Sequence, residues 1–359
     1  MNKSVESELP VVVQKYGGSS VANTERVLSI ADRIERNLSK GNRLVVVLSA
    51  MGSTTDDLVS LANQVSDRPA GREMDLLLST GEQVTVSLLG LALQNKGVPA
   101  ISLTALQCGI RTDGVFNVAR IQSIDTGRIR AELRAGRVVI VTGFQGISET
   151  NDVTTLGRGG SDITGAALAA ALGAAACEIC TDVDGVFSAD PSRVSNAKLW
   201  PEISYEEAIE MASSGAKVLH PRAAEICMEY NVAIHVRNSF HLRQGTWIRG
   251  GESLMERAEV VSVTSDSKVA KITLLNVPDE PGMAARVFRD LAQAGVNIRL
   301  IIQSASSENQ TRITFIFDLE FLSAAKELVE RWKSSGLMGN CVIESDVAKI
   351  SIVGSRLAS

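Results

Sequence analysis

The sequence predicts an α/β protein with a mainly parallel sheet that is covered by helices on both faces, followed by a smaller α+β unit. The first part rests on short β-branched runs that alternate with alanine- and leucine-rich stretches, and on the continuous apolar character of those runs. Strands of this kind are typical of parallel sheets that are buried on both faces. The second part rests on a new order of elements, strand–helix–strand–strand–helix, which begins near residue 265.

The predicted elements of the first part follow each other at short intervals. Its strands are expected at 10–14, 43–49, 98–103, 137–142, 176–182 and 232–237, and helical patterns include 22–38, 73–95 and 161–175. In open parallel sheets, ligands bind beyond the carboxyl ends of the strands. The motifs described below stand at those ends.

The second part has the element order of a ferredoxin-like unit. Its first strand contains "VAKIT" at 269–273, which recurs as "VAKIS" at 347–351. We therefore expect a larger domain over 1–250, one complete small module over 265–345, and the first strand of a truncated second module over 346–359. A chance similarity of two short strands is the alternative interpretation.

Composition excludes several classes of protein. A length of 359 residues exceeds what one core usually supports, and a net charge of −5 argues against nucleic-acid binding. There is no run of 18 apolar residues and no apolar segment near the start, so we expect a cytoplasmic protein without membrane contact. The one close cysteine pair, Cys177 and Cys180, favours buried thiols over a metal site.

A lysine stands directly before a glycine turn at the end of the first strand, in "VVVQKYGGSS" at 11–20. This order places the ammonium group of Lys15 beside backbone that can approach a phosphate without obstruction by a Cβ atom. Taken alone, a surface lysine before a tight turn is the simpler interpretation. The spacing is not that of the P-loop, whose lysine follows its glycines.

A second glycine-rich stretch, "TTLGRGGSDITG" at 154–165, precedes an alanine-rich helix. We expect Ser161 to cap that helix over 162–175, with free amide groups and a positive helix end facing outward. Arg158 adds a fork suited to a carboxylate or phosphate. Asp162 fits two roles, the orientation of a lysine or the stabilisation of the helix N-terminus. The stretch alone therefore fits an anion site and a flexible turn equally well.

Three further segments are suggestive but weaker. "TDVDGVFSADP" at 181–191 fits a loop beside a nucleotide or Mg²⁺, although Asp-Gly and Asp-Pro also mark plain turns. "SAMGSTTDD" at 49–57 and "LSTGEQ" at 78–83 are rich in hydroxyl groups, with Glu82 as a lone carboxylate. The sequence lacks GxxxxGK[ST], GxGxxG, HExxH and GxSxG, which argues against the commonest phosphate, dinucleotide, zinc and acyl-transfer sites.

Taken together and in order, these segments resemble the aspartate kinases of the amino-acid kinase superfamily. The matching stretches are "QKYGGSSVA" (14–22), "VVVLSAMGSTTDDL" (45–58), "LLSTGEQ" (77–83), "VTGFQG" (141–146), "DVTTLGRGGSD" (152–162), "TDVDGVFSADP" (181–191), "GAKVLHPRA" (215–223) and "VRNSF" (236–240). The resemblance implies a three-layer αβα sandwich followed by a ferredoxin-like ACT domain, the first of the two that this family carries.

The resemblance also implies an activity, the phosphorylation of the side-chain carboxylate of L-aspartate by ATP with Mg²⁺. The product is 4-phospho-L-aspartate, the first step towards lysine, threonine and methionine. Two residues are implied as catalytic, Lys15 as the cation that stabilises the transferring phosphoryl group and Asp162 as the group that holds this lysine.

The same resemblance, applied motif by motif, implies two sets of binding residues. The substrate-binding residues are Ser49, Thr55, Glu82, Arg158 and Ser161. The nucleotide-binding residues are Lys15, Gly17, Gly18, Ser19, Thr181, Asp182, Phe187, Arg193 and Lys217. No side chain is assigned as a metal ligand.

Two departures from the family pattern bear on function. Ser192 stands where the family usually has an arginine, with Arg193 one place later. Arg299 stands in a segment where the family usually has an aspartate near its lysine or threonine effector, and an arginine would repel the effector's ammonium group. Together with the short second module, this predicts weakened feedback inhibition.

Two further expectations concern partners and alternatives. The open sheet edges of the small module predict a homo-oligomer formed through the ACT region. There are two alternatives to an aspartate kinase: a kinase of a different amino acid, and a catalytically poor regulatory subunit.

Overall fold

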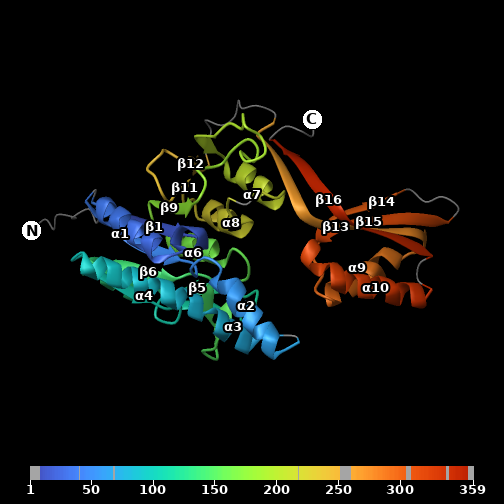
Figure 1. Ribbon diagram of the computed structural model, residues 1–359, viewed down its shortest axis with the longest axis horizontal. Coiled ribbons are helices and arrows are strands. Elements are labelled where there is room, and N and C mark those ends of the chain that lie inside the picture. The colour runs from blue at the N-terminus through green and yellow to red at the C-terminus, as the bar shows by residue number, and fades with distance from the viewer. Residues whose placement is uncertain are drawn as a thin grey trace, which may run out of the picture. The chain divides into compact units, whose positions relative to one another are not determined.

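The computed structural model describes residues 9–39, 41–67, 69–216, 218–250, 260–304, 309–336 and 339–354. The chain divides into two compact units, residues 1–262 together with 353–359, and residues 263–352 (Figure 1). Lys217, one of the predicted nucleotide-binding residues, lies outside the described residues.

The larger unit is built on an eight-stranded sheet. Its strands are β1 (Val11–Tyr16), β2 (Arg43–Leu48), β3 (Ala100–Leu103), β6 (Val138–Thr142), β9 (Ala176–Thr181), β10 (Glu202–Ile203), β11 (Ile234–Asn238) and β12 (Thr246–Ile248). They lie in the order β10-β12-β11-β9-β1-β2-β6-β3, and every neighbouring pair is parallel except β11 with β12. The predicted mainly parallel sheet is confirmed.

The apolar runs of these strands are explained by burial on both faces. Side chains point alternately to the two faces of a sheet, so in β2 Val45 and Val47 join one core cluster and Leu44 and Val46 join the other. The first face is covered by α5 (Gly127–Arg134), α6 (Gly160–Leu172) and α8 (Pro221–Glu229), with α7 (Tyr205–Ser213) packed on α8. The second is covered by α1 (Thr24–Leu38) and α4 (Thr80–Asn95) (Figure 1).

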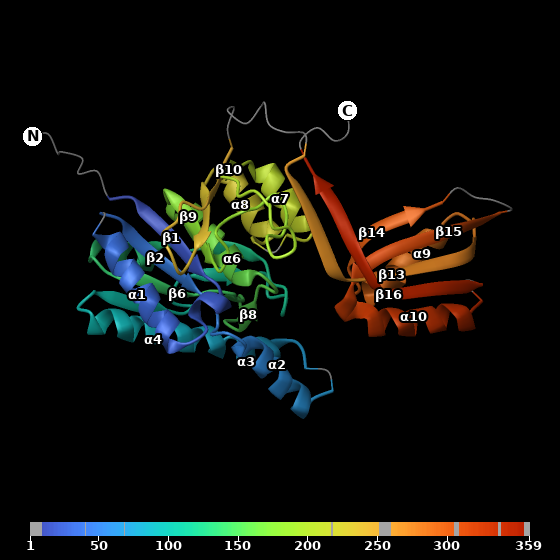
Figure 2. The ribbon, with the colours of Figure 1, turned by 45° about the horizontal axis from the view of Figure 1, so that its top comes forward.

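A second, smaller sheet and the helix α2 were not among the elements predicted from the sequence. The sheet has the order β5-β4-β7-β8, from β4 (Ile110–Thr112), β5 (Ile121–Ile124), β7 (Gln145–Ile147) and β8 (Val153–Thr155). The helices α2 (Thr54–Val65) and α3 (Arg72–Leu78) lie side by side (Figure 2). The predicted helix 73–95 is therefore two helices, because the chain turns at Ser79 between α3 and α4.

The helical stretch Arg72–Asn95 is long and apolar enough to cross a membrane by length and composition, within the part of the chain that the structure describes. In the fold, Val86, Leu89 and Leu93 of this stretch are buried in the core cluster beneath α4. Its apolar character therefore serves the packing of α4 on the central sheet.

The smaller unit has the predicted ferredoxin-like arrangement, with one further strand. Its elements are β13 (Ser262–Pro278), α9 (Met283–Gln293), β14 (Ile298–Gln303), β15 (Gln310–Asp318), the short helix η3 (Leu319–Phe321), α10 (Leu322–Ser334) and β16 (Asn340–Val353). The strands lie in the order β14-β15-β13-β16. The boundary proposed at residue 346 falls inside β16, and the repeated "VAKIT" and "VAKIS" segments lie on neighbouring strands.

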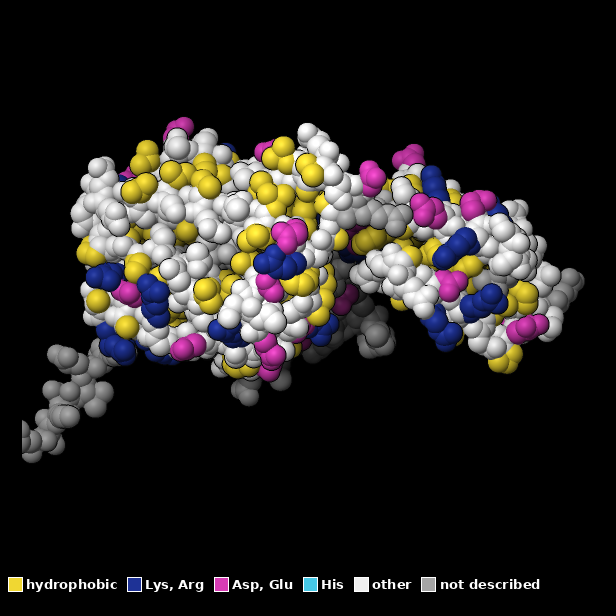
Figure 3. All heavy atoms as spheres, turned by 90° about the horizontal axis from the view of Figure 1, so that it is seen from below, with side chains coloured by type: hydrophobic (Ala, Val, Ile, Leu, Met, Phe, Trp, Pro, Cys, Tyr) yellow, Lys and Arg dark blue, Asp and Glu magenta, His cyan; other side chains and the backbone are white. Residues whose placement is uncertain are grey.

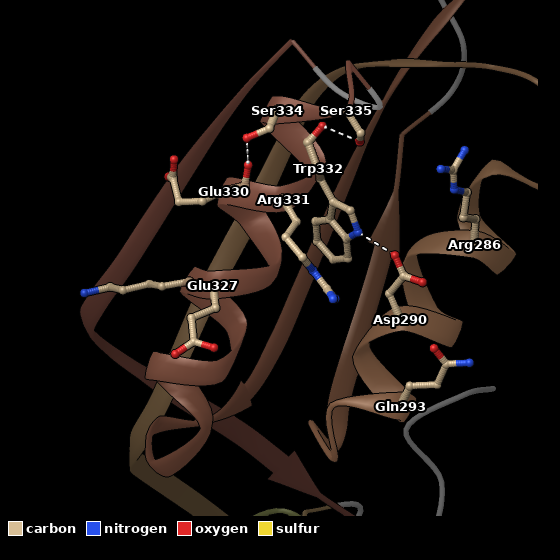
Figure 4. A pocket seen from close by; sticks show the side chains of 10 residues that line it. Arg286, Asp290, Gln293, Glu327, Glu330, Arg331, Trp332, Ser334 and Ser335 are labelled. Atoms are coloured by element: carbon tan, nitrogen blue, oxygen red, sulfur yellow. Dashed lines mark hydrogen bonds between the residues drawn. The ribbon is translucent and has the colours of Figure 1, made fainter.

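One face of this small sheet is covered by α9 and α10. Val287 and Leu291 of α9 and Leu328 and Trp332 of α10 are buried against it. A groove of about 940 Å³ lies between the two helices, where Trp332 Nε1 donates a hydrogen bond of 2.7 Å to Asp290 Oδ2 (Figure 4). Charged side chains of both signs are interspersed on this helical side (Figure 3), and the residues that line the groove include Arg286, Glu327 and Arg331.

Candidate active site

The predicted site residues gather at the carboxyl ends of the central parallel strands. Lys15 is the penultimate residue of β1, Ser49 follows β2, and Thr181 ends β9. These three strands are direct neighbours in the order β9-β1-β2. The parallel arrangement therefore brings segments that are distant in the sequence to one edge, where α/β proteins bind their ligands.

Lys15 and Asp162 form an ion pair at this edge. Lys15 Nζ lies 2.6 Å from Asp162 Oδ1, and each side chain is only 12% exposed. The other carboxylate oxygen, Oδ2, accepts a hydrogen bond of 3.2 Å from the backbone amide of His220. Asp162 also lies in the first turn of α6, where the helix dipole favours a negative charge. The carboxylate is thus held from two sides and can orient the ammonium group.

The N-terminus of α6 differs from the sequence prediction. Ser161 was expected to cap a helix over 162–175, but α6 begins at Gly160 and its N-cap residue is Gly159, with φ of +71°. The glycine adopts a left-handed conformation that other residues avoid, so the helix starts earlier. Ser161 lies inside the first turn, and its hydroxyl group is instead 2.7 Å from that of Ser49. No N-cap side chain covers the first amide groups of α6.

Glu82 is a buried carboxylate in the first turn of α4, only 3% exposed. Its Oε1 accepts a hydrogen bond of 3.1 Å from the backbone amide of Ala50, directly after Ser49. Its Oε2 is buried and has no hydrogen-bond partner within the described part of the chain. Burial raises the pKa of Glu82 to about 7, and interactions with its own backbone amide, the amide of Ala50 and the side chain of Gln145 offset only part of this rise. The unpartnered oxygen suits a cationic group of a ligand.

The other two predicted substrate-binding residues lie on adjoining segments. Arg158 is exposed on the loop between β8 and α6. Thr55 is half-buried in the first turn of α2, directly after the β2 loop. The structure therefore places Ser49 and Ser161 in direct contact, and it leaves Arg158 accessible to solvent.

The glycine turn after β1 is shaped by close backbone approaches. A Cβ atom on Gly18 would lie 3.1 Å from the carbonyl oxygen of Ala50, and one on Gly17 would lie 3.3 Å from Lys15 Nζ. The short helix η1 (Gly18–Val21) follows, and Ser19 within it is exposed. The glycines thus leave both the ammonium group and the neighbouring backbone uncovered, as a phosphate site requires.

The nucleotide residues predicted on the loop after β9 occupy three different environments. Thr181 ends the strand and donates a hydrogen bond of 3.2 Å from its hydroxyl group to Asp182 Oδ1. Asp182 is exposed, and Phe187 is half-buried where its backbone forms a bridge with Leu199. Only Thr181 and Asp182 therefore lie directly beside the carboxyl end of β9.

Ser192, which departs from the family pattern, and the neighbouring Arg193 both interact with Asp190 of their own loop. Ser192 donates from its backbone and its hydroxyl group to Asp190 Oδ1, at 2.9 and 2.7 Å. Arg193 Nε lies 3.8 Å from Asp190 Oδ2, and the side chain is exposed. Ser192 thus continues the turn that Asp190 organises, and the arginine is held one position further along.

Three residues that the structure connects to the site have no role predicted from the sequence. The backbone of His220 holds Asp162, as described above. Asn238, the last residue of β11, contacts the loop after β9, and Ser239 directly after it contacts Ser20 beyond the glycine turn. The available signal was the pair of polar residues at the end of an apolar strand, which marks the ligand-binding edge of a parallel sheet.

The buried parallel sheet presents a lysine, a glycine turn and a glycine-capped helix at one edge. These groups can bind phosphate, so the arrangement is suited to a kinase of a small molecule. The comparison with known families agrees, because the model of the amino acid kinase family matches residues 10–238 and that of the ACT domain matches residues 271–336. The chain belongs to the amino acid kinase family, and within it to the aspartokinases.

Its similarity to curated aspartokinases extends over nearly the whole chain. The aspartokinase of Geobacillus stearothermophilus is 44% identical over 349 residues, which are 97% of this chain and 85% of that protein. The aspartokinase of Thermus thermophilus is 44% identical over 353 residues, which are 98% of this chain and 87% of that protein.

Solved structures of similar proteins agree. Aspartokinase III of E. coli in complex with aspartate and ADP has 27% identity and a TM-score of 0.79, over 97% of this chain and 88% of that one. The aspartate kinase of Synechocystis has 44% identity and a TM-score of 0.61, over 96% of this chain. The present chain spans 60% of the length of that Synechocystis protein.

Proposed function

We propose that the protein transfers the terminal phosphoryl group of ATP to the side-chain carboxylate of L-aspartate, giving 4-phospho-L-aspartate and ADP. The observation that carries this proposal is the ion pair of Lys15 with Asp162 beside the glycine turn, at 2.6 Å. The likeness to an aspartokinase solved with aspartate and ADP supports the choice of both substrates.

The chemistry asks little of the protein beyond positioning and charge. The aspartate carboxylate is already ionised, so it attacks phosphorus without a general base, and the bond from phosphorus to the ADP oxygen breaks. Catalysis then consists of holding the reactants and stabilising the negative charge. Lys15 supplies the cation, Asp162 fixes its position, and Gly17, Gly18 and Ser19 offer backbone to the phosphates.

Substrate recognition follows from the charges at the site. The unpartnered oxygen of Glu82 would bind the α-ammonium group of aspartate. The exposed guanidinium group of Arg158 would bind the α-carboxylate, as a fork that matches two oxygens. Ser49, Ser161 and Thr55 would line the space between them with hydroxyl groups.

The nucleotide would lie along the loop after β9, bordered by Thr181, Asp182, Phe187 and Arg193, with Lys217 as a further neighbour. The described residues contain no cluster of three or more metal-binding side chains. We place Mg²⁺ on the phosphate oxygens of ATP, with the exposed Asp182 as a suitable carboxylate ligand. The ion would neutralise phosphate charge.

The activity is tested by trapping the acyl phosphate with hydroxylamine in the presence of MgATP and L-aspartate. We expect aspartyl hydroxamate, formed in step with ADP. Hydroxamate from another amino acid but not from aspartate would favour a kinase of that amino acid. No hydroxamate from any amino acid, with folded protein, would favour a regulatory subunit.

The raised pKa of Glu82 predicts the pH dependence of aspartate binding. Only the ionised carboxylate pairs with an ammonium group, and a group with a pKa of about 7 is mostly protonated at pH 6 and mostly ionised at pH 8. The kcat/KM for aspartate should therefore rise about tenfold from pH 6 to pH 8. Glu82→Gln should raise the KM for aspartate and remove this rise.

A matched control for this prediction is Glu207→Gln, since Glu207 is also buried but serves the N-terminal capping box of α7. This variant should keep the wild-type pH profile. If the Glu82→Gln enzyme shows the same rise with pH as the wild type, a different group controls aspartate binding.

We also propose weakened feedback inhibition, which rests on Arg299 in β14. Its Nη2 lies 2.7 Å from Asp318 Oδ1, and its Nη1 lies 3.7 Å from Asp266 Oδ2. The two carboxylates hold the guanidinium charge in place and are themselves occupied, so an effector's ammonium group would meet a cation. At roughly 1 mM, lysine or threonine should change the aspartate-dependent rate by less than about twofold. Strong inhibition by either amino acid below that concentration would contradict the proposal.

We further propose that the protein is a cytoplasmic homo-oligomer that associates through its ACT region and serves the synthesis of lysine, threonine and methionine. The support comes from the two strands at the edges of the small sheet. Leu300, Ile301 and Ile302 of β14 and Ile350 and Ile352 of β16 are exposed. Apolar edge strands of this kind usually pair with another chain.

A further inference from the structure

The turn at the end of β11, residues 238–240, adjoins the ends of two segments that the proposed function assigns to the nucleotide. β11 runs parallel to β9, and Asn238 stands beside Thr181 in their register. Beyond the strand, the backbone amide of Ser239 donates a hydrogen bond of 2.8 Å to the carbonyl oxygen of Thr181. We call residues 238–240 the β11 turn.

The β11 turn is joined to the glycine turn by a pair of buried hydroxyl groups. Ser239 Oγ lies 2.7 Å from Ser20 Oγ, and both residues are buried. Ser20 belongs to the short helix η1 and directly follows Ser19, the last of the three residues whose backbone is proposed to bind phosphate. Loss of either hydroxyl group would leave the other without this partner in a buried place, which is unfavourable.

The same turn is joined to the nucleotide loop by the side chain of Asn238. Its Nδ2 donates to the carbonyl oxygen of Asp182 at 3.2 Å and to Asp184 Oδ1 at 3.0 Å. Its Oδ1 accepts a hydrogen bond of 2.8 Å from the backbone amide of Phe240. The amide group therefore ties the first residues of the nucleotide loop to the β11 turn.

Helix α1 holds the β11 turn from a further side. Arg33 of this helix is buried and donates a hydrogen bond of 2.6 Å to the carbonyl oxygen of Asn238. The guanidinium group of Arg26 lies 4.8 Å from the ring centre of Phe240 and also donates to the carbonyl oxygen of Ser19. Arg33 thus ties the β11 turn to α1, and Arg26 connects the turn with the helix that follows the glycine turn.

We infer that Asn238 and Ser239 are positioning residues for the nucleotide, which set the place of the glycine turn relative to the loop after β9. The inference rests on the proposed assignment of these two segments to ATP. The substrate side of the site is attached through other elements, since Glu82 bonds to Ala50 and Ser161 to Ser49. The β11 turn should therefore affect MgATP and leave aspartate largely unaffected.

The test compares Ser20→Ala, Ser239→Ala, their double variant, Ser239→Thr and Asn238→Asp in steady-state kinetics with both substrates. Ser239→Ala should raise the KM for MgATP about fivefold to tenfold, with the KM for aspartate within about twofold. The double variant should be no worse than either single variant, because all three lack the same bond. Ser239→Thr keeps the hydroxyl group and should restore most of the affinity.

Asn238→Asp gives a second, independent measure. It keeps the acceptor for the amide of Phe240 but replaces the donor with a carboxylate that faces Asp184. The KM for MgATP should rise more than in Ser239→Ala. Calorimetric titration with MgADP should show the same order of affinities, without any need for turnover.

A matched control is Thr112→Val, which breaks an equally buried hydroxyl pair, Thr112 Oγ1 to Thr154 Oγ1 at 2.7 Å, in the small sheet. It should lower the melting temperature and leave MgADP affinity unchanged. Two results would overturn the inference. One is a Ser239→Ala variant with a lower melting temperature but unchanged MgADP affinity, and the other is an equal rise in the KM for MgATP and the KM for aspartate. A wild type that makes no aspartyl hydroxamate would count against the proposed function alone, since the MgADP titration still tests the turn.

Discussion

Lys15→Ala is expected to lower kcat roughly a hundredfold to a thousandfold, with a much smaller change in the KM for aspartate. A preorganised charge that acts on the developing negative charge of a transition state contributes about this much when it is removed. Lys15 is suited to this task because its side chain is only 12% exposed and its ammonium group is held at 2.6 Å by Asp162. Rates at saturating MgATP and aspartate measure the effect.

Lys15→Met separates the charge from the volume of the side chain and should be as inactive as Lys15→Ala. Lys96→Met is the matched control, since Lys96 is also ion-paired, to Asp32 at 2.6 Å, but on the surface of α1 and α4. Surface ion pairs contribute little, so this variant should keep full activity. A Lys15→Ala enzyme with wild-type kcat would exclude Lys15 as the stabilising cation.

Gly159→Ala is the second change for which we expect a large effect. Gly159 has φ of +71°, and a Cβ atom there would lie 2.3 Å from His220 Cδ2, closer than real contacts allow. The left-handed conformation costs an alanine about 1 kcal/mol, and the overlap adds roughly 1–3 kcal/mol. To relieve this overlap, His220 would have to move, and its backbone amide, which holds Asp162, would be displaced. We expect kcat to fall by more than about tenfold, because small misplacements of reacting groups are costly.

Gly173→Ala at the other end of α6 isolates the backbone contribution. Gly173 has φ of +62°, but nothing lies within 4 Å of the position of its Cβ atom. This variant should lose about 1 kcal/mol of unfolding free energy and keep its activity. If Gly159→Ala and Gly173→Ala lose the same unfolding free energy and both keep their activity, the contact with His220 does not hold the site.

Local sequence patterns correctly predicted the central sheet and the helices that cover it, but they misplaced the N-terminus of α6 at the site. The apolar runs of β1, β2 and β6 follow from burial on both faces, a property that each segment carries by itself. The four strands of the small sheet are three or four residues long, too short for their own residues to specify them. Ser161 has the chemistry of an N-cap, but the left-handed glycine before it and its contact with Ser49 decide its place.

By itself, the sequence determined the fold class and the chemical types available at the carboxyl edge: a lysine before glycines, a glycine-rich loop before a helix, and a carboxylate in "LSTGEQ". Only the tertiary structure decided which of these groups meet, that Lys15 pairs with Asp162 and that Ser239 joins Ser20. It also decided the pKa of Glu82, because that value depends on burial beneath other segments. Periodicity and turn chemistry are local properties, whereas contacts and desolvation arise only when distant segments pack together.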